Sequence, residues 1–148
     1  DYSQWFSDIG FKMIQYFFEQ INAIEISEST TIWLKTIILN ENKKSGEINY
    51  IFCDDEYLLQ INRNYLQHDY YTDIITFDYV KGKTISGDIF VSLPRISDNA
   101  STHSKNFEDE LHRVLAHGIL HLCGYKDKTE EEEKEMRSKE DFYLALRS

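Results

Sequence analysis

The sequence predicts an α+β fold in which a small mixed four-stranded sheet packs against about five helices. All four runs of β-favouring residues lie before residue 93, and the chain beyond has helical periodicity. The 148 residues are 41% hydrophobic, which is enough for one domain with a buried core. One proline and six glycines leave no linker that would divide the chain, so we expect a single domain over residues 1–148.

The first part of the chain alternates strand and helix signals. Residues 13–18 are rich in aromatic and branched side chains and predict a strand. Met13 could also be the native start, which would make residues 1–12 a non-native remnant. Ser29 and Thr30 are expected at the N-terminal cap of a helix that reaches Leu39. Residues 47–52 predict a second strand.

A second helix and a β-hairpin are predicted next. Asp54 or Asp55 would cap the helix at its N-terminus. The apolar stripe of this helix would consist of Leu58, Leu59, Ile61 and Tyr65. Residues 73–79 and 86–92 predict two further strands, and residues 81–83 supply a turn between them. We therefore expect these two strands to pair as a hairpin.

The rest of the chain, beyond residue 93, has the sequence pattern of helices. A short helix is expected over residues 94–100, because proline is tolerated in the first turn of a helix. Residues 107–123 carry a broad apolar surface, which predicts a largely buried helix. Thr129 and Glu132 have the spacing of a capping box. They should begin a last helix that reaches about Ala145.

The charge balance is acidic, with a net charge of −10. This counts against nucleic-acid-binding proteins that depend on a broad basic patch, and we expect no DNA partner. Part of the acidity comes from a run of glutamates at residues 130–133, which predicts a solvated helix face. A single-stranded nucleic acid needs fewer phosphate contacts than a duplex and could be bound by a confined set of cations. The candidates are Arg63, Lys81, Lys83, Arg95, Lys105 and Arg113.

The sequence also indicates where the protein is located and whether its cysteines form a disulfide. The apolar runs are far shorter than the ~20 residues that a membrane span needs. The chain does not open with a secretory signal pattern, so we expect a cytoplasmic protein without a membrane partner. Cys53 and Cys123 are the only cysteines, and we expect them to be free thiols.

The most informative stretch is HGILHLCGYKD at residues 117–127. His117 and His121 are four residues apart in a helix, so their imidazoles share one face. Gly124 can take the left-handed conformation that ends a helix, and the chain can then return Asp127 to that face. Three protein ligands with a free fourth position are typical of catalytic zinc, and we predict that His117, His121 and Asp127 bind one Zn²⁺.

One position separates two kinds of zinc site with this spacing. Metallopeptidases of the HExxH type have a glutamate general base directly after the first histidine. Gly118 occupies that position here and has no side chain. The sequence therefore favours metal-assisted hydrolysis without a glutamate base.

At these residues the chain resembles the YbeY family of bacterial endoribonucleases, which act in rRNA maturation. HGILHLCGYKD is similar to the family signature HGxLHLxGYDH. Residues 72–77, TDIITF, resemble the family's TDVLSF, and residues 87–89, GDI, match its GDI. The resemblance extends from near Glu47 to the C-terminus.

The resemblance implies a zinc-dependent endoribonuclease specific for single-stranded RNA, acting in rRNA maturation and ribosome quality control. Its partners would be rRNA and the ribosome or ribosomal proteins, and a metal-bound water would attack the phosphodiester. Thr72, Asp73 and Thr76 would belong to the wall of the substrate cleft. In this chain Asp127 replaces the family's usual third histidine. Leu66 stands where the family commonly has an arginine that would steady a phosphate.

Two other functions remain open from the sequence. A zinc metallopeptidase would need another acid, such as Asp73, as its base. A metal-stabilised factor on the ribosome would need no catalysis at all. The ligand set also suits nickel, copper or iron. Among the other histidines, we expect His112 at the surface and His103 in solvent.

Overall fold

The computed structural model of the protein describes residues 14–147, so Met13 and the possible remnant at residues 1–12 lie outside it. The elements in chain order are β1 (Ile14–Glu19), α2 (Glu28–Asn40), β2 (Lys44–Cys53), α3 (Asp55–Leu66), β3 (Ile74–Asp78), β4 (Thr84–Ser92), α4 (Leu93–Thr102), α5 (Phe107–Leu122) and α6 (Glu130–Leu146). The predicted α+β fold, with a four-stranded mixed sheet and five helices over the described residues, is confirmed.

The sheet has the strand order β1-β2-β4-β3. The first three of these strands are parallel, and β3 pairs antiparallel with β4 at one edge. The predicted hairpin is confirmed, because β3 and β4 are consecutive and pair Asp78 with Gly87 close to the turn. One edge of the sheet therefore consists of the strand that carries part of the TDIITF segment.

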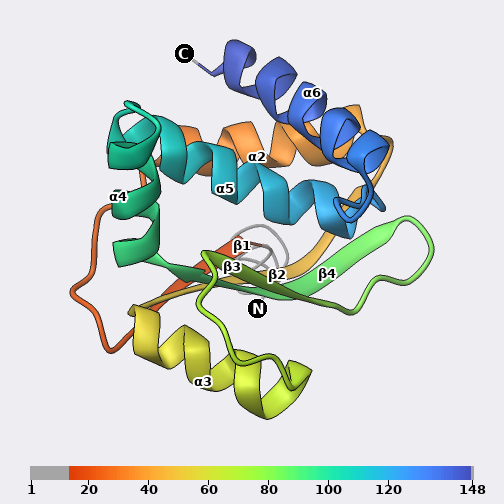
Figure 1. The fold of residues 1–148 in the computed structure, drawn as a ribbon. Coiled ribbons are helices and arrows are strands. Elements are labelled where there is room, and N and C mark those ends of the chain that lie inside the picture. Colours follow the sequence, from red (N-terminus) through yellow and green to blue (C-terminus); the bar gives the residue numbers. More distant parts are fainter. Residues whose placement is uncertain (1–13, 148) are drawn as a thin grey trace, which may run out of the picture.

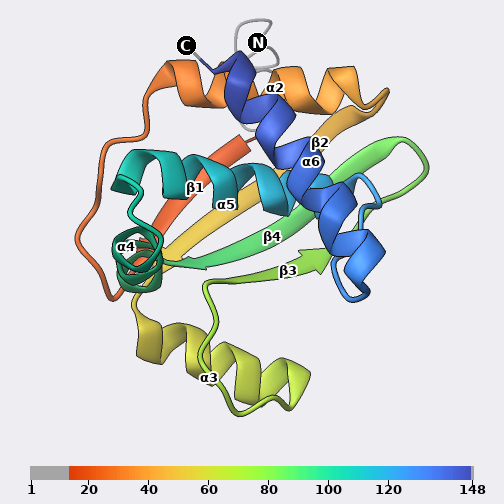
Figure 2. The same cartoon turned by 45° about the horizontal axis from the view of Figure 1, so that its top comes forward.

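The helices are divided between the two faces of the sheet. α2 and α5 lie over one face, α6 lies across α5, and α3 lies on the opposite side (Figure 1). Figure 2, in which the top of the molecule is turned toward the viewer, shows α5 running over the middle of the sheet. None of the helices between residues 14 and 147 combines the length and apolar character that crossing a membrane requires.

The main core lies between α5 and the sheet. Alternate residues of β2, among them Ile48, Tyr50 and Phe52, are fully buried on this face. The Tyr50 hydroxyl donates a hydrogen bond to the Leu115 carbonyl at 2.7 Å, so one of the largest fully buried side chains also fixes the helix. The prediction that the metal-bearing helix is largely buried is confirmed, with nine of its residues buried.

Helix caps follow the local sequence closely. Asp54 caps α3 by accepting a hydrogen bond from the Tyr57 amide, as one of the two predicted positions. Thr129 and Glu132 form the predicted capping box of α6. The cap of α2 was predicted too late, because Ser27 rather than Ser29 or Thr30 accepts the hydrogen bond, from the Thr30 amide.

Two predicted side-chain environments are wrong. His112 was expected at the surface, but it is only 3% exposed. Its Nε2 lies 2.8 Å from the Thr30 hydroxyl and its Nδ1 2.6 Å from the Glu108 carbonyl, so burial is matched by hydrogen bonds. In α3, Tyr65 was expected in the apolar stripe but is exposed, and Asn62 is buried instead.

Two glycines allow α5 to approach the sheet closely. A Cβ at Gly118 would lie 3.0 Å from two atoms of Ile89 and 3.3 Å from Ile74. A Cβ at Gly87 would lie 2.5 Å from the Phe77 carbonyl and 2.9 Å from Leu122. These contacts give a steric reason for glycine at both positions, since a side chain would push the metal-bearing helix away from β3 and β4.

Gly118→Ala is expected to destabilise the protein by about 1–3 kcal/mol, because the added methyl group overpacks the contact with Ile89. The better helix propensity of alanine would offset up to about 1 kcal/mol of that loss. Urea unfolding of both proteins measures the difference. Ser101→Ala, at an exposed site in α4, should change stability by no more than about 0.5 kcal/mol and serves as the control.

Candidate metal centre

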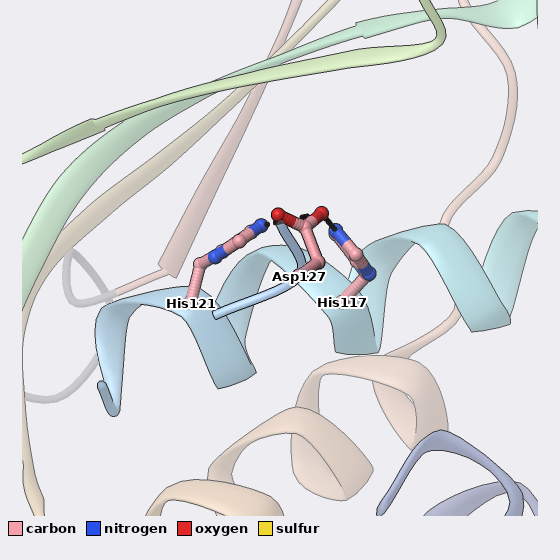
Figure 3. A group of neighbouring side chains, drawn as sticks. All are labelled: His117, His121 and Asp127. Carbon is pink, nitrogen blue, oxygen red and sulfur yellow. Dashed lines mark hydrogen bonds and ion pairs between the residues drawn. The ribbon is translucent and has the colours of Figure 1, made fainter. Parts of the chain in front are cut away.

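The centre is built on the C-terminal half of α5. His117 and His121 lie one turn apart on the same face, with ring centroids 4.5 Å apart and ring planes nearly perpendicular. Figure 3 shows both imidazoles turned toward the same point above the helix. The predicted pairing of the two histidines is therefore present in the folded chain.

Asp127 completes the group after a reversal of the chain. Gly124 has a φ of 109°, a left-handed value that favours glycine, and it follows the end of α5 directly. The Asp127 Oδ2 atom lies 3.1 Å from Nε2 of His117 and 3.3 Å from Nε2 of His121 (Figure 3). One ligand atom from each residue lies within 4.8 Å of the others, which is a separation suited to one metal ion.

The opposite nitrogen of each ring has its own acceptor. His117 Nδ1 lies 2.7 Å from Oε2 of Glu140, and His121 Nδ1 lies 3.0 Å from the Tyr125 carbonyl. An acceptor at Nδ1 holds the proton of the neutral imidazole there and leaves the Nε2 lone pair for a metal. Both rings therefore present the same nitrogen to Asp127 and to the space between them.

Glu140 is a buried charge with two partners. Its side chain on α6 is only 6% exposed. The Arg113 guanidinium donates to Oε1 of Glu140 at 2.8 Å and to Oδ1 of Asp141 at 2.6 Å. Burying a carboxylate is costly unless it is paired, and here Arg113 on one side and His117 on the other satisfy both oxygens. The result is a continuous chain of contacts from Arg113 to His117, the first candidate metal ligand.

The electrostatic environment acts on the two histidines in opposite directions. Burial alone would lower the pKa of His117, but the hydrogen bond and charge of Glu140, with Asp127 and Asp73, raise it above its ordinary value. Burial and the neighbouring His117 lower the pKa of His121, although Asp127 opposes this. Burial also raises the pKa of Asp73.

The ligands open into a cleft of about 1300 Å³ between two walls. One wall is formed by residues 62–78, and the other by α6 with the end of the preceding loop. The three predicted substrate-binding residues, Thr72, Asp73 and Thr76, all line this cleft together with His117 and His121. Their place beside the ligands is therefore observed, while their contact with a substrate stays a prediction.

Most of the cationic side chains that were predicted to bind RNA lie outside the cleft. Arg63 pairs with Asp69 and Arg95 with Asp55, and neither lines the cleft. Of the predicted set only Arg113 lines the cleft, and Glu140 and Asp141 neutralise it. The cleft instead gains cations that the sequence analysis missed, on and before α6, namely Lys128, Lys134 and Arg137.

The remaining histidines and cysteines stand apart from the ligand group. His103 is exposed, as predicted. Cys53 and Cys123 are free thiols, and burial raises the pKa of each to about 12. Cys123 is only half-buried, and it lies outside the cluster that His117, His121 and Asp127 form in the described chain.

The sequence analysis missed the two groups that orient the histidines. Glu140 lies 23 residues after His117, beyond the reach of a local spacing argument. A signal was available, because Met136, Glu140 and Tyr143 occupy one buried stripe of α6. A glutamate on the apolar face of an amphipathic helix indicates a buried partner. The second group is the main-chain carbonyl of Tyr125, which no side-chain pattern in the sequence could have identified.

The family model described as endoribonuclease YbeY matches residues 15–147. A relative from Flavobacterium johnsoniae named endoribonuclease YbeY is 55% identical over 134 residues, covering 90% of this chain and 96% of its own. One from Cytophaga hutchinsonii with the same name is 56% identical over 136 residues, covering 89% and 94%. A solution structure from Thermotoga maritima matches with a TM-score of 0.65 at 27% identity, over 88% of this chain and 86% of the other.

Proposed function

Because the chain belongs to the YbeY family of endoribonucleases, we propose that it hydrolyses single-stranded RNA during rRNA maturation at His117, His121 and Asp127. The observation that carries the proposal is the convergence of two Nε2 atoms and one carboxylate oxygen in a cleft. rRNA and the ribosome would be its partners, in the cytoplasm.

The donor set fits zinc. Two imidazole nitrogens and one carboxylate oxygen leave a fourth position for water or substrate, which is typical of catalytic zinc sites. A bound Zn²⁺ supplies a lowered pKa for a water ligand and charge stabilisation for a phosphoryl oxygen. The same donors suit nickel, copper or iron, so we assign zinc as the expected metal and leave its measurement to experiment.

The chain's own residues would perform four tasks. Glu140 and the Tyr125 carbonyl orient the two imidazoles, and Asp127 offsets the positive charge of the centre. Asp73, half-buried in the cleft wall near His117, is the group to which we assign proton transfer at its carboxyl oxygens. Asn99 lies 3.4 Å from one of these oxygens and would hold the carboxyl group in place.

Gly118 argues against the peptidase alternative in the folded chain as well. A Cβ at this position would lie 3.0 Å from Ile89 and 3.3 Å from Ile74 of the sheet. Gly118 has no side chain, so the position directly after His117 supplies no base to the centre, and a larger residue there would be crowded by these two isoleucines.

The test is cleavage of matched single-stranded and duplex RNA oligonucleotides, with zinc-loaded and chelator-treated protein. We expect the single strand to be cut and chelation to abolish the cutting. Casein, incubated in parallel, should stay intact. Chelator-sensitive casein cleavage would favour the peptidase, and a protein whose Tm falls on chelation but which cuts neither substrate would favour the non-catalytic ribosomal factor.

A further inference from the structure

We propose that His68 and Tyr70 form a base-stacking platform at the rim of the metal cleft, which seats one base of the RNA strand. The inference rests on the proposed function and adds to it how the strand lies in the cleft. Both residues line the same cleft as His117, His121 and Asp127. The platform would thus set the distance between a bound base and the scissile phosphodiester.

The two rings are already ordered as a pair. Their centroids lie 5.2 Å apart with planes 18° from parallel, and the Tyr70 hydroxyl lies 3.0 Å from His68 Nδ1. His68 is exposed, and Tyr70 remains 55% exposed. Single exposed apolar side chains need no explanation, but a stacked and hydrogen-bonded pair beside a metal cleft presents a fixed aromatic face.

The loop under the platform is held by a buried side chain. Asn62 is only 1% exposed, and its Nδ2 donates to the Tyr70 carbonyl at 2.9 Å. The Asn62 carbonyl accepts a hydrogen bond from the His68 amide at 3.1 Å. Gln67, which lies between Asn62 and His68 in the chain, takes a left-handed conformation with a φ of 56° and ends α3. One buried asparagine therefore fixes both platform residues, which reduces the entropy lost when a base binds.

The charge distribution of the cleft determines which side of the strand faces this rim. Among the described residues that line the cleft, the wall formed by 62–78 contributes no lysine or arginine, and Leu66 stands at the position of the family arginine. Lys128, Lys134 and Arg137 lie on the wall formed by α6 and the loop before it, interspersed with the carboxylates of that wall. These carboxylates are Glu130, Glu133, Glu140 and Asp141. Phosphates would lie beside these individual cations rather than along a uniformly positive wall. Bases would lie toward His68 and Tyr70, since every base has a π-face that can stack on an aromatic ring.

The test uses zinc-loaded protein and a short single-stranded oligoribonucleotide that carries 2-aminopurine, whose fluorescence is quenched when it stacks. Binding is followed by stopped-flow fluorescence and anisotropy, and cleavage in the steady state. Tyr70→Ala should weaken binding roughly 5- to 150-fold, the effect expected for one stacked base. It should also remove the quenching and raise KM more than it changes kcat. Tyr70→Phe should restore the quenching, because it keeps the ring.

Tyr79→Ala is the matched control. Tyr79 is 58% exposed, close to the value for Tyr70, but lies outside the cleft. This variant should bind the oligoribonucleotide and quench its 2-aminopurine fluorescence as the unmodified protein does. His68→Ala tests the platform independently and should also weaken binding and quenching. If Tyr70→Ala and His68→Ala bind and quench normally while the unmodified protein cuts RNA, the platform is wrong and the proposed function stands. If the unmodified protein neither binds nor cuts RNA, both are overturned.

Discussion

His117→Ala and His121→Ala are each expected to reduce bound zinc from about one ion per chain to nearly none and to abolish RNA cleavage. Each variant removes one of three ligands, and the remaining pair cannot enclose the ion. Elemental analysis of protein purified without a nickel column measures the metal. A saturating metal at about 1,000 times its Kd stabilises a folded protein by about 4 kcal/mol, so zinc should raise the Tm of the unmodified protein but not that of either variant.

His103→Ala provides the control for these variants. His103 is exposed at the end of α4 and does not belong to the ligand cluster. This variant should retain its zinc, its Tm shift and its cleavage. Retention of a full equivalent of zinc by His117→Ala would show that the ligand assignment is wrong. Loss of cleavage with zinc retained would instead separate metal binding from catalysis.

Glu140→Gln is expected to weaken zinc binding about 10- to 100-fold, the usual effect of removing an outer partner of a ligating histidine. Glutamine has nearly the same shape as glutamate, but its neutral amide accepts the hydrogen bond from His117 Nδ1 without the full negative charge of the carboxylate. It also leaves Arg113 with the exposed Asp141 as its remaining carboxylate partner. Competition with a fluorescent zinc chelator measures the affinity, and circular dichroism confirms that the variant is folded.

Asp141→Asn is the matched control for Glu140→Gln. Asp141 is the other carboxylate that Arg113 contacts, but it does not touch His117. Its replacement removes a surface ion pair, which is worth about 0–1 kcal/mol, and should leave zinc affinity within about threefold. If both variants weaken zinc binding equally, the effect comes from Arg113 or from α6 as a whole rather than from the contact between Glu140 and His117.

Much of the fold was predictable because its determinants are local. The alternation of Ile48, Tyr50 and Phe52 marks a half-buried strand, and Thr129 with Glu132 marks the start of α6. The errors occurred where burial depends on a distant element. His112 is buried because Thr30 of α2 lies against it, 82 residues away in the chain. No periodicity within α5 identifies that partner.

The features of the candidate metal centre are likewise partly determined by local sequence and partly by tertiary packing. The sequence by itself determined which residues form the candidate ligand group. A four-residue helical spacing and a left-handed glycine place His117, His121 and Asp127 together through backbone geometry over eleven residues. Only the tertiary structure decided that Glu140 orients His117, that Arg113 neutralises Glu140, and that His68 and Tyr70 lie at the rim of the same cleft. These contacts join residues on separate elements, and their positions depend on how α6 and the loop after α3 pack around α5, which short-range spacing does not encode.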